Sequence, residues 1–148
     1  MPNDEEFKDL ILETEFIFVY GTLRRGAANS MHNELPRYAE FYTDASMQGK
    51  LFEIDDYPAA ILSDSLEDKV YGELYRIIRR GKLLLLLDEY EGCNKRSPRP
   101  HEYIRKKIPV SHSNGQSTPA WVYLYNRPIK RMKQIESGDY VSFIRSGK

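Results

Sequence analysis

The chain has 148 residues, enough for one domain that buries about two-thirds of its unfolded surface. Its 22 lysines and arginines balance 22 aspartates and glutamates, so we expect neither nucleic acid nor a membrane as a partner. The only cysteine, Cys93, excludes an intramolecular disulfide framework, and no apolar run is long enough to span a membrane. The N-terminal residues are acidic, whereas those of a signal peptide are basic. We therefore predict a cytoplasmic protein with a single domain over residues 1–148, and the oligomeric state stays open.

The first residues predict a short helical extension at about 1–14. Phe7, Leu10 and Ile11 are spaced i, i+3 and i+4 and give this helix one apolar face.

The stretch 16–26 is the centre of the predicted fold. Residues 16–20 are apolar, aromatic and β-branched, which is typical of a buried strand. At Gly21 we expect a sharp turn that directs several consecutive N–H groups into one small concavity, a nest that favours a carboxylate or an oxyanion. Glycine permits the φ angle that such a turn requires and the close approach of a ligand. The alternative is an ordinary turn at a strand end, with solvated arginines.

The residues after this turn predict a short helix and then strands. We expect a helix over 27–35 that Pro36 ends, and one or two strands over 41–54 with a break near Gln48 and Gly49.

The middle of the chain predicts two further strands. Residues 57–62 carry a proline and favour the edge of a sheet. Residues 70–77 alternate apolar and polar side chains, as a half-buried strand does, and Gly72 indicates a bulge or a close approach.

The last third predicts a hairpin and a weak final strand. Residues 103–111 and 118–125 pair around a turn at Asn114-Gly115, and 140–144 form the last strand. Residues 93–102 read as an exposed loop. Many strands, few helices and no regular βαβ alternation predict an α+β fold around a curved or barrel-like sheet.

The leucine run in the middle of the chain predicts a helix from Leu83 to Glu91. On a helical wheel at roughly 100° per residue, Glu91 lies between Leu84 and Leu87 in an apolar arc that includes Tyr90. A carboxylate on the buried face of a helix is costly unless it is paired or takes a raised pKa, which suits acid–base catalysis near neutral pH.

The position of Glu91 at the helix end leaves a second interpretation open. Gly92 is expected to cap the helix, and the negative end of the helix dipole would also raise the pKa of Glu91. Alternatively, the last turn frays and Glu91 is exposed, or it pairs with an arginine such as Arg105.

Two motifs, Tyr20-Gly21-Thr22-Leu23 and Leu87-Asp88-Glu89-Tyr90-Glu91-Gly92, resemble those of the γ-glutamylcyclotransferase-like superfamily. The similarity is to small bacterial AIG2-like members and γ-glutamylamine cyclotransferases, and it covers roughly residues 16–125. Four further matches follow in the expected order: 57–60, 72–75, 103–105 and 120–125. The resemblance implies a small mixed β-barrel with a few flanking helices.

The resemblance also implies a reaction and a set of site residues. Members of the superfamily cyclise a γ-glutamyl group and release 5-oxoproline with a free amine or amino acid, without a metal or an organic cofactor. By the motifs, Glu91 would be the catalytic acid/base. The substrate-binding residues would be Tyr20, Gly21, Thr22, Leu23, Tyr103 and Tyr125.

Two other functions remain as alternatives. The chain would be a non-catalytic small-molecule binding or regulatory module if it keeps the pocket without turnover. It would be a protein-interaction domain if the basic residues Lys95, Arg96 and Arg99 bind a partner.

Other reactive side chains do not form a recognisable site in the sequence. Nothing places His101 or His112 beside Cys93 as a base, so we expect an inert cysteine. The spacing of these histidines and His32 is not that of metal ligands, and we expect no metal.

Overall fold

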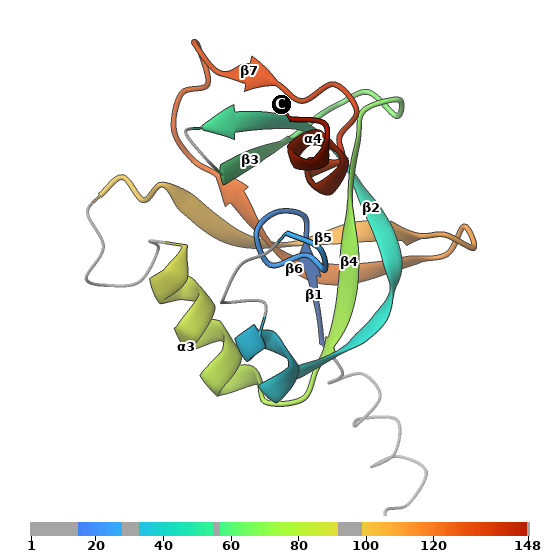
Figure 1. Ribbon diagram of the computed structural model, residues 1–148. Coiled ribbons are helices and arrows are strands. Elements are labelled where there is room, and N and C mark those ends of the chain that lie inside the picture. The colour runs from blue at the N-terminus through green and yellow to red at the C-terminus, as the bar shows by residue number, and fades with distance from the viewer. Residues whose placement is uncertain (1–14, 28–32, 55–56, 92–98, 148) are drawn as a thin grey trace, which may run out of the picture.

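The structure is a computed structural model that describes residues 15–27, 33–54, 57–91 and 99–147 (Figure 1). The predicted N-terminal helix lies outside these residues. In chain order the described elements are β1 (Phe16–Val19), a 3₁₀ helix η1 (Leu35–Arg37), β2 (Ala39–Ile54), β3 (Tyr57–Leu62), β4 (Lys69–Ile77), α3 (Arg80–Tyr90), β5 (Tyr103–His112), β6 (Ser117–Tyr125), β7 (Lys133–Gln134) and α4 (Tyr140–Arg145).

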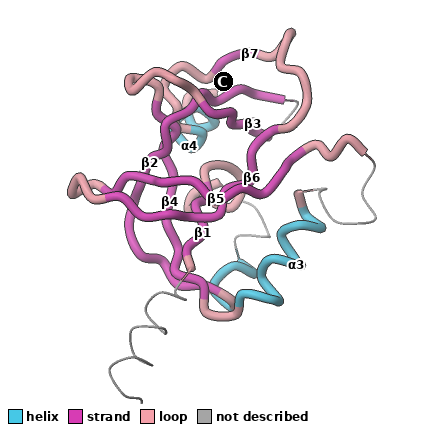
Figure 2. The backbone as a smooth tube through the Cα atoms, turned by 180° about the vertical axis from the view of Figure 1, so that it is seen from behind, coloured by secondary structure: helices cyan, strands magenta, loops and turns pink. Residues whose placement is uncertain are grey.

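Five of these strands close into a barrel. Strand β1 pairs antiparallel with β4, β4 with β2, β2 with β5 and β5 with β6, and β6 returns parallel to β1. The single parallel pairing makes the barrel mixed. Figure 2 shows the barrel from behind, with α3 beside it and β3 and β7 beyond one end. The predicted α+β fold with a small mixed barrel and a few flanking helices is confirmed.

Strand β2 is continuous, so the predicted break near Gln48 and Gly49 is wrong. The strand changes partner at this point, because residues up to Gln48 pair with β4 and residues from Gly49 pair with β3. A Cβ atom on Gly49 would lie 2.5 Å from the carbonyl oxygen of Ile61. The glycine therefore permits a close approach of two strands and does not end the strand.

Several other predicted strands are confirmed. Strand β3 lies at the edge of the sheet, and strands β5 and β6 form the predicted hairpin, with Gly115 at a φ of 88° in its turn. Gly72 in β4 is the predicted site of close approach, since a Cβ atom there would lie 2.1 Å from the carbonyl oxygen of Val19.

The predicted helix over 27–35 lies largely outside the described residues, although residues 33 and 34 are helical and lead into η1. Pro36 lies in the first turn of η1, where a missing N–H costs nothing. The predicted final strand is wrong. Residues 140–145 are helical and not a strand, because the side chain of Asp139 accepts a hydrogen bond from the N–H of Ser142 and caps helix α4. The β-branched and aromatic composition of this short segment favoured the wrong period.

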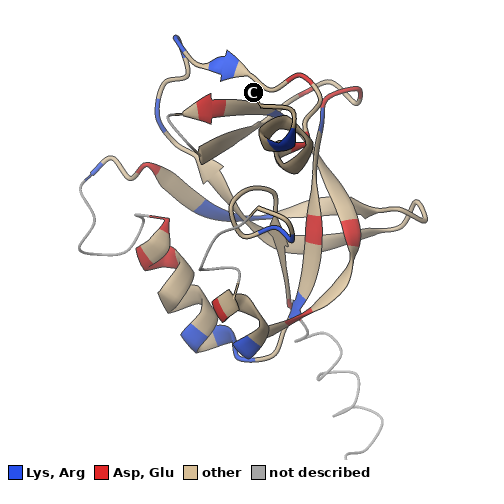
Figure 3. Ribbon diagram, viewed as in Figure 1, with Lys and Arg blue, Asp and Glu red and all other residues tan. Residues whose placement is uncertain are grey.

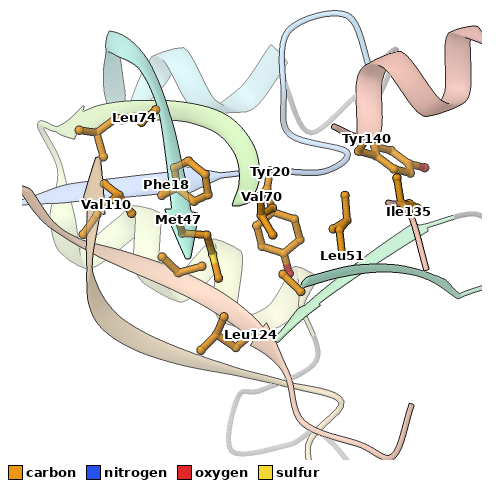
Figure 4. Close-up of a cluster of buried hydrophobic side chains, with 14 residues drawn as sticks. Phe18, Tyr20, Met47, Leu51, Val70, Leu74, Val110, Leu124, Ile135 and Tyr140 are labelled. Atoms are coloured by element: carbon orange, nitrogen blue, oxygen red, sulfur yellow. The ribbon is translucent and has the colours of Figure 1, made fainter. Parts of the chain in front are cut away.

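The apolar side chains form two clusters on opposite faces of β1. Phe18 and Tyr20 belong to the first cluster, which draws on all five barrel strands and on α4 (Figure 4). Ile17 and Val19 belong to the second, together with Leu83 and other buried residues of α3. Strand β1 is thus buried on both faces, which explains its continuous apolar run, and its end lies between the barrel and α3.

Candidate active site

A cavity of about 280 Å³ opens where β1 ends. This volume is at the lower end of the range for small-molecule sites, roughly 300–1,000 Å³. The turn after β1, the start of β3, the C-terminal end of α3 and the start of β5 contribute most of the wall. The lining residues are Phe18, Val19, Tyr20, Gly21, Thr22, Leu23, Tyr57, Pro58, Tyr90, Glu91, Glu102, Tyr103 and Tyr123.

The predicted turn after β1 is present. The N–H of Arg24 donates to the carbonyl oxygen of Gly21 at 3.0 Å, and the N–H of Ala27 donates to that of Arg24 at 3.2 Å. The reason for glycine at position 21 differs from the predicted one, because its φ is not positive. A Cβ atom on Gly21 would instead lie 2.4 Å from Cγ of Pro58, so glycine lets β3 pack against the turn.

The turn has backbone donors at the wall of the cavity. None of the hydrogen bonds among the described residues uses the N–H of Gly21 or Thr22, and both residues line the cavity. Buried or half-buried N–H groups without a protein acceptor are well placed to bind an anionic or carbonyl oxygen.

A buried glutamate fixes the other side of this turn. Glu73 of β4 is only 2% exposed, and its carboxylate accepts hydrogen bonds from Nε of Arg24 at 3.1 Å and from the N–H of Arg25 at 2.9 Å. Arg24 also pairs with Asp139 at 2.8 Å, while the guanidinium of Arg25 lies 4.0 Å above the ring of Phe41. The two arginines are therefore not solvated freely but attach the turn to the barrel.

Glu91 lies at the C-terminal end of α3 and lines the cavity. The N–H of Glu91 donates to the carbonyl oxygen of Leu87 at 2.8 Å, so the helix continues to this residue and does not fray. Leu83, Leu84 and Leu87 are buried as predicted, whereas Tyr90 is 38% exposed. The ion pair considered for Glu91 is not formed, because Arg105 pairs with Asp88 at 3.4 Å.

The charges on α3 run against its dipole. Figure 3 shows acidic residues at the C-terminal end of the helix and basic residues at its N-terminal end. A carboxylate at the C-terminal end of a helix is electrostatically unfavourable. A stable fold alone gives no reason for placing Glu91 there.

The surroundings of Glu91 favour its protonated form. Burial raises the pKa of Glu91 to about 8, and the negative charge of Glu102 contributes in the same direction. Among the described residues, no group donates a hydrogen bond that would offset this burial. A carboxyl group with a pKa near neutral pH can both accept and donate a proton in one reaction.

Two buried tyrosines form the wall behind Glu91. The hydroxyl of Tyr20 donates to the carbonyl oxygen of Tyr123 at 2.5 Å, and that of Tyr103 donates to the carbonyl oxygen of Pro58 at 2.7 Å. Burial raises the pKa of both tyrosines well above the usual value, and nearby negative charge including that of Glu91 adds to the effect. Both therefore act as neutral hydroxyl groups that shape the cavity.

The mouth of the cavity is polar and aromatic. The hydroxyl of Tyr57 donates to Oε2 of Glu102 at 2.7 Å on one side. The hydroxyls of Thr22 and Tyr90 lie 2.8 Å apart on the other, which ties the turn to the end of α3.

The structure brings most of the predicted site residues to one cavity. Tyr20, Gly21, Thr22, Leu23, Tyr103 and Glu91 all line it. Among the described residues, Tyr125 does not line the cavity but packs edge-on against Tyr103, with ring centroids 5.5 Å apart.

The lining or anchoring residues that were not predicted include Tyr57, Tyr90, Glu102 and Glu73. Tyr57 and Glu73 lie in motifs that supported the resemblance. The sequence therefore marked both segments, but it did not show that these two side chains lie at the cavity or anchor its turn. Glu102 directly precedes Tyr103 but was assigned to an exposed loop, because sequence patterns do not show which loop residues face a cavity.

None of the other candidate residues that the structure describes lines this cavity. Cys93 and the basic residues Lys95 and Arg96 lie outside the described residues. His112 contacts Thr118 at 2.6 Å on the hairpin, far along β5 from the cavity. Within the described ranges, no three histidine, cysteine or acidic side chains are arranged to hold a metal ion, and no helix has the length and apolarity needed to cross a membrane.

Comparisons with known proteins agree with this architecture. YtfP of Escherichia coli, named as a gamma-glutamylcyclotransferase family protein, is 34% identical over 128 residues, which cover 84% of this chain and 95% of YtfP. The solution structure of E. coli ytfP has a TM-score of 0.59, with 33% identity and coverage of 87% of this chain and 98% of that one.

Two more distant relatives extend the comparison. Gamma-glutamylaminecyclotransferase A of Danio rerio is 30% identical over 113 residues, or 72% of this chain and 66% of that protein. The crystal structure of YkqA from Bacillus subtilis has a TM-score of 0.67 with 25% identity and covers 91% of this chain, which spans only 43% of YkqA.

The family model for gamma-glutamyl cyclotransferase, AIG2-like proteins matches residues 17–142, from the first barrel strand to the last helix. The chain belongs to the gamma-glutamyl cyclotransferase, AIG2-like family.

Proposed function

We propose that the protein is a cyclotransferase that converts a γ-glutamyl amine or peptide into 5-oxoproline and a free amine, with Glu91 as acid and base. The observation that carries the proposal is the meeting of Glu91 and the turn after β1 in one cavity. The name of the zebrafish relative supports a γ-glutamyl amine as the substrate class.

The backbone of the turn would bind the α-carboxylate of the glutamyl group. The N–H groups of Gly21 and Thr22, which none of the hydrogen bonds among the described residues uses, suit a carboxylate. The small cavity, about 280 Å³, favours a folded glutamyl group over an extended one. A glutamyl group held in this way is folded, with its α-amine near its own γ-carbonyl. Such positioning supplies much of the rate of an intramolecular reaction.

The reaction itself needs only proton transfers from the protein. Glu91 takes a proton from the α-ammonium, and the resulting amine attacks the γ-carbonyl carbon to form the new C–N bond. The amide C–N bond then breaks, and the leaving nitrogen receives this proton from Glu91. The ring nitrogen gives up its second hydrogen as a proton to the released amine. No water is consumed, so the substrate divides into 5-oxoproline and a protonated amine.

The test is the release of 5-oxoproline from a panel of γ-glutamyl amines and peptides, with the Glu91→Gln variant beside the wild type. Loss of the acid/base should lower kcat by about 10²–10⁴-fold. Glu89→Gln is the matched control, because Glu89 is the exposed neighbour on the same helix and does not line the cavity.

Two outcomes would contradict the proposal. Full turnover by Glu91→Gln would remove Glu91 from its role. Binding of a panel member, seen as a raised Tm, with no 5-oxoproline from any of them would indicate the alternative, a binding module that keeps the pocket.

A further inference from the structure

The mouth of the cavity holds a second carboxylate that the proposed reaction does not use. Glu102, the residue before β5, lines the same cavity as Glu91 and is half-buried. The hydroxyl of Tyr57 donates to Oε2 at 2.7 Å and fixes the orientation of the carboxylate, which keeps further acceptor positions on Oε1.

Three tyrosines lie near this carboxylate. Tyr57 and Tyr103 have ring centroids 6.4 Å apart, and Tyr125 packs on Tyr103 at 5.5 Å. Burial raises the pKa of Tyr125, and the charge of Glu102 adds to this effect, so all three tyrosines lie within its electrostatic reach. A carboxylate among aromatic rings is an environment that binds an organic ammonium group, through an ion pair and through the faces of the rings.

The charge of the cavity points to the same ligand. Its described lining residues include two carboxylates, Glu91 and Glu102, and no lysine or arginine. A low-dielectric cleft lined by one sign of charge attracts the opposite charge. In the proposed binding mode the backbone of the turn binds the α-carboxylate of the glutamyl group. A γ-glutamyl amine carries no second anionic group that Glu102 would repel.

The position of Glu102 assigns it to the leaving group. The bond that breaks must lie beside Glu91, which protonates the leaving nitrogen. Beyond that bond, the interior of the cavity is closed by Phe18, Val19 and Leu23, which do not accommodate a polar amine. The rest of the leaving amine must therefore extend toward the mouth, where Glu102 and Tyr57 lie.

We infer that Glu102 selects γ-glutamyl substrates whose leaving amine carries a second, cationic amino group, as in a mono-γ-glutamyl diamine. This inference rests on the proposed cyclotransferase activity. Glu102 acts here as a specificity determinant, and Glu91 alone carries out the proton transfers.

The experiment compares matched substrates. The mono-γ-glutamyl derivatives of straight-chain diamines are paired with derivatives of alkylamines in which a methyl group replaces the distal ammonium. The measured quantity is the ratio of kcat/KM within each pair, in the wild type, Glu102→Gln and the control Glu89→Gln. A ratio is insensitive to a general loss of activity, and a change in the pKa of Glu91 affects both substrates alike.

We expect the wild type and Glu89→Gln to prefer the best diamine derivative by roughly tenfold, equivalent to about 1.4 kcal/mol, and the ratio in Glu102→Gln to fall toward one. If this variant does not fold, the wild type still provides the test. Its ratio should decrease between low and high salt, because added salt screens a half-exposed ion pair.

Each contrary result is separable from failure of the proposed function. Equal turnover of both members of every pair by the wild type overturns the inference and leaves the cyclotransferase intact. If Glu102→Gln leaves the ratio of kcat/KM unchanged, the inference is also overturned. Glu102 would then interact with the α-ammonium group that both substrates share. Absence of 5-oxoproline from every derivative overturns the proposed function and this inference with it.

Discussion

Glu73 and Glu91 are the same residue type in opposite environments on either side of one turn. Glu73 is almost fully buried and neutralised by Arg24 and by backbone and side-chain groups of Arg25. Glu91 lines an open cavity, and the charge near it is the like charge of Glu102. The two carboxylates therefore have different roles. The paired carboxylate of Glu73 stabilises the turn, whereas the unpaired carboxyl group of Glu91 can exchange a proton near neutral pH.

The largest expected effect is on stability and comes from Glu73, the paired carboxylate. Replacing Glu73 by Gln leaves Arg24 and Arg25 without their buried counter-charge, which should lower the free energy of unfolding by about 3 kcal/mol. Urea denaturation measures the change, with the exposed Glu89→Gln expected within about 0.5 kcal/mol of the wild type. A loss below about 1 kcal/mol in Glu73→Gln would show that the turn does not depend on this pair.

Replacing Glu91 by Gln should change the free energy of unfolding in the opposite direction. The pKa of Glu91 is raised to about 8 from an ordinary value of 4.5, so the folded protein binds an extra proton between these pH values. Stability of the wild type is therefore lost as the pH rises through this window. Glu91→Gln has no such cost and should be more stable by at least about 1–2 kcal/mol at pH 8, with little difference at pH 4.5.

Thermal or urea unfolding of both proteins at a series of pH values checks this prediction. If Glu91→Gln is less stable than the wild type at pH 8, the carboxylate of Glu91 has a stabilising partner in solution. It would then not be the unpaired group that the proton transfer requires.

A smaller effect should appear in the pH dependence of the reaction. Glu102 helps to raise the pKa of Glu91, so its negative charge holds the proton on Glu91. As the base must be ionised, kcat/KM should rise with pH through about 8 in the wild type. In Glu102→Gln the rise should move to lower pH by up to about one unit.

The pH profiles of all variants are measured with one substrate. The ionisation of that substrate therefore contributes equally to each profile and does not affect the difference between them. Glu89→Gln should keep the wild-type profile. A profile that is unchanged in Glu102→Gln would indicate that the two carboxylates do not interact in solution.

The smallest effect concerns the contact between the two regions. Tyr90→Phe removes the hydroxyl that lies 2.8 Å from Thr22 and ties the turn to the end of α3. We expect a loss of about 0.5–1 kcal/mol, the net value of one exposed hydrogen bond, as a rise in KM with kcat nearly unchanged. A fall in kcat alone would instead indicate that the contact aligns Glu91 in the transition state.

Much of this fold follows from local patterns. The continuous apolar run of β1, the Asn-Gly turn of the hairpin and the leucine face of α3 each appear in the structure as predicted. Strand β4 is present, but its predicted half-buried alternation is interrupted, because residues 72–75 are all buried. The misassigned segments are those whose neighbours decide their conformation. Asp139 makes 140–145 helical by capping it, and Gly49 is required by the carbonyl of Ile61 on a strand that only folding brings close.

For the site, the sequence by itself determined that a turn follows the first strand and that Glu91 shares the apolar face of its helix, since both depend on residues close in the chain. Only the tertiary structure decided that the two lie in one cavity, that Arg24 and Arg25 are bound by Glu73, and that Glu102 stands at the mouth. These facts depend on barrel closure, which joins residues as far apart in the chain as Ile17 and Trp121. The electrostatic character of a carboxylate is set by those distant neighbours and not by its own segment.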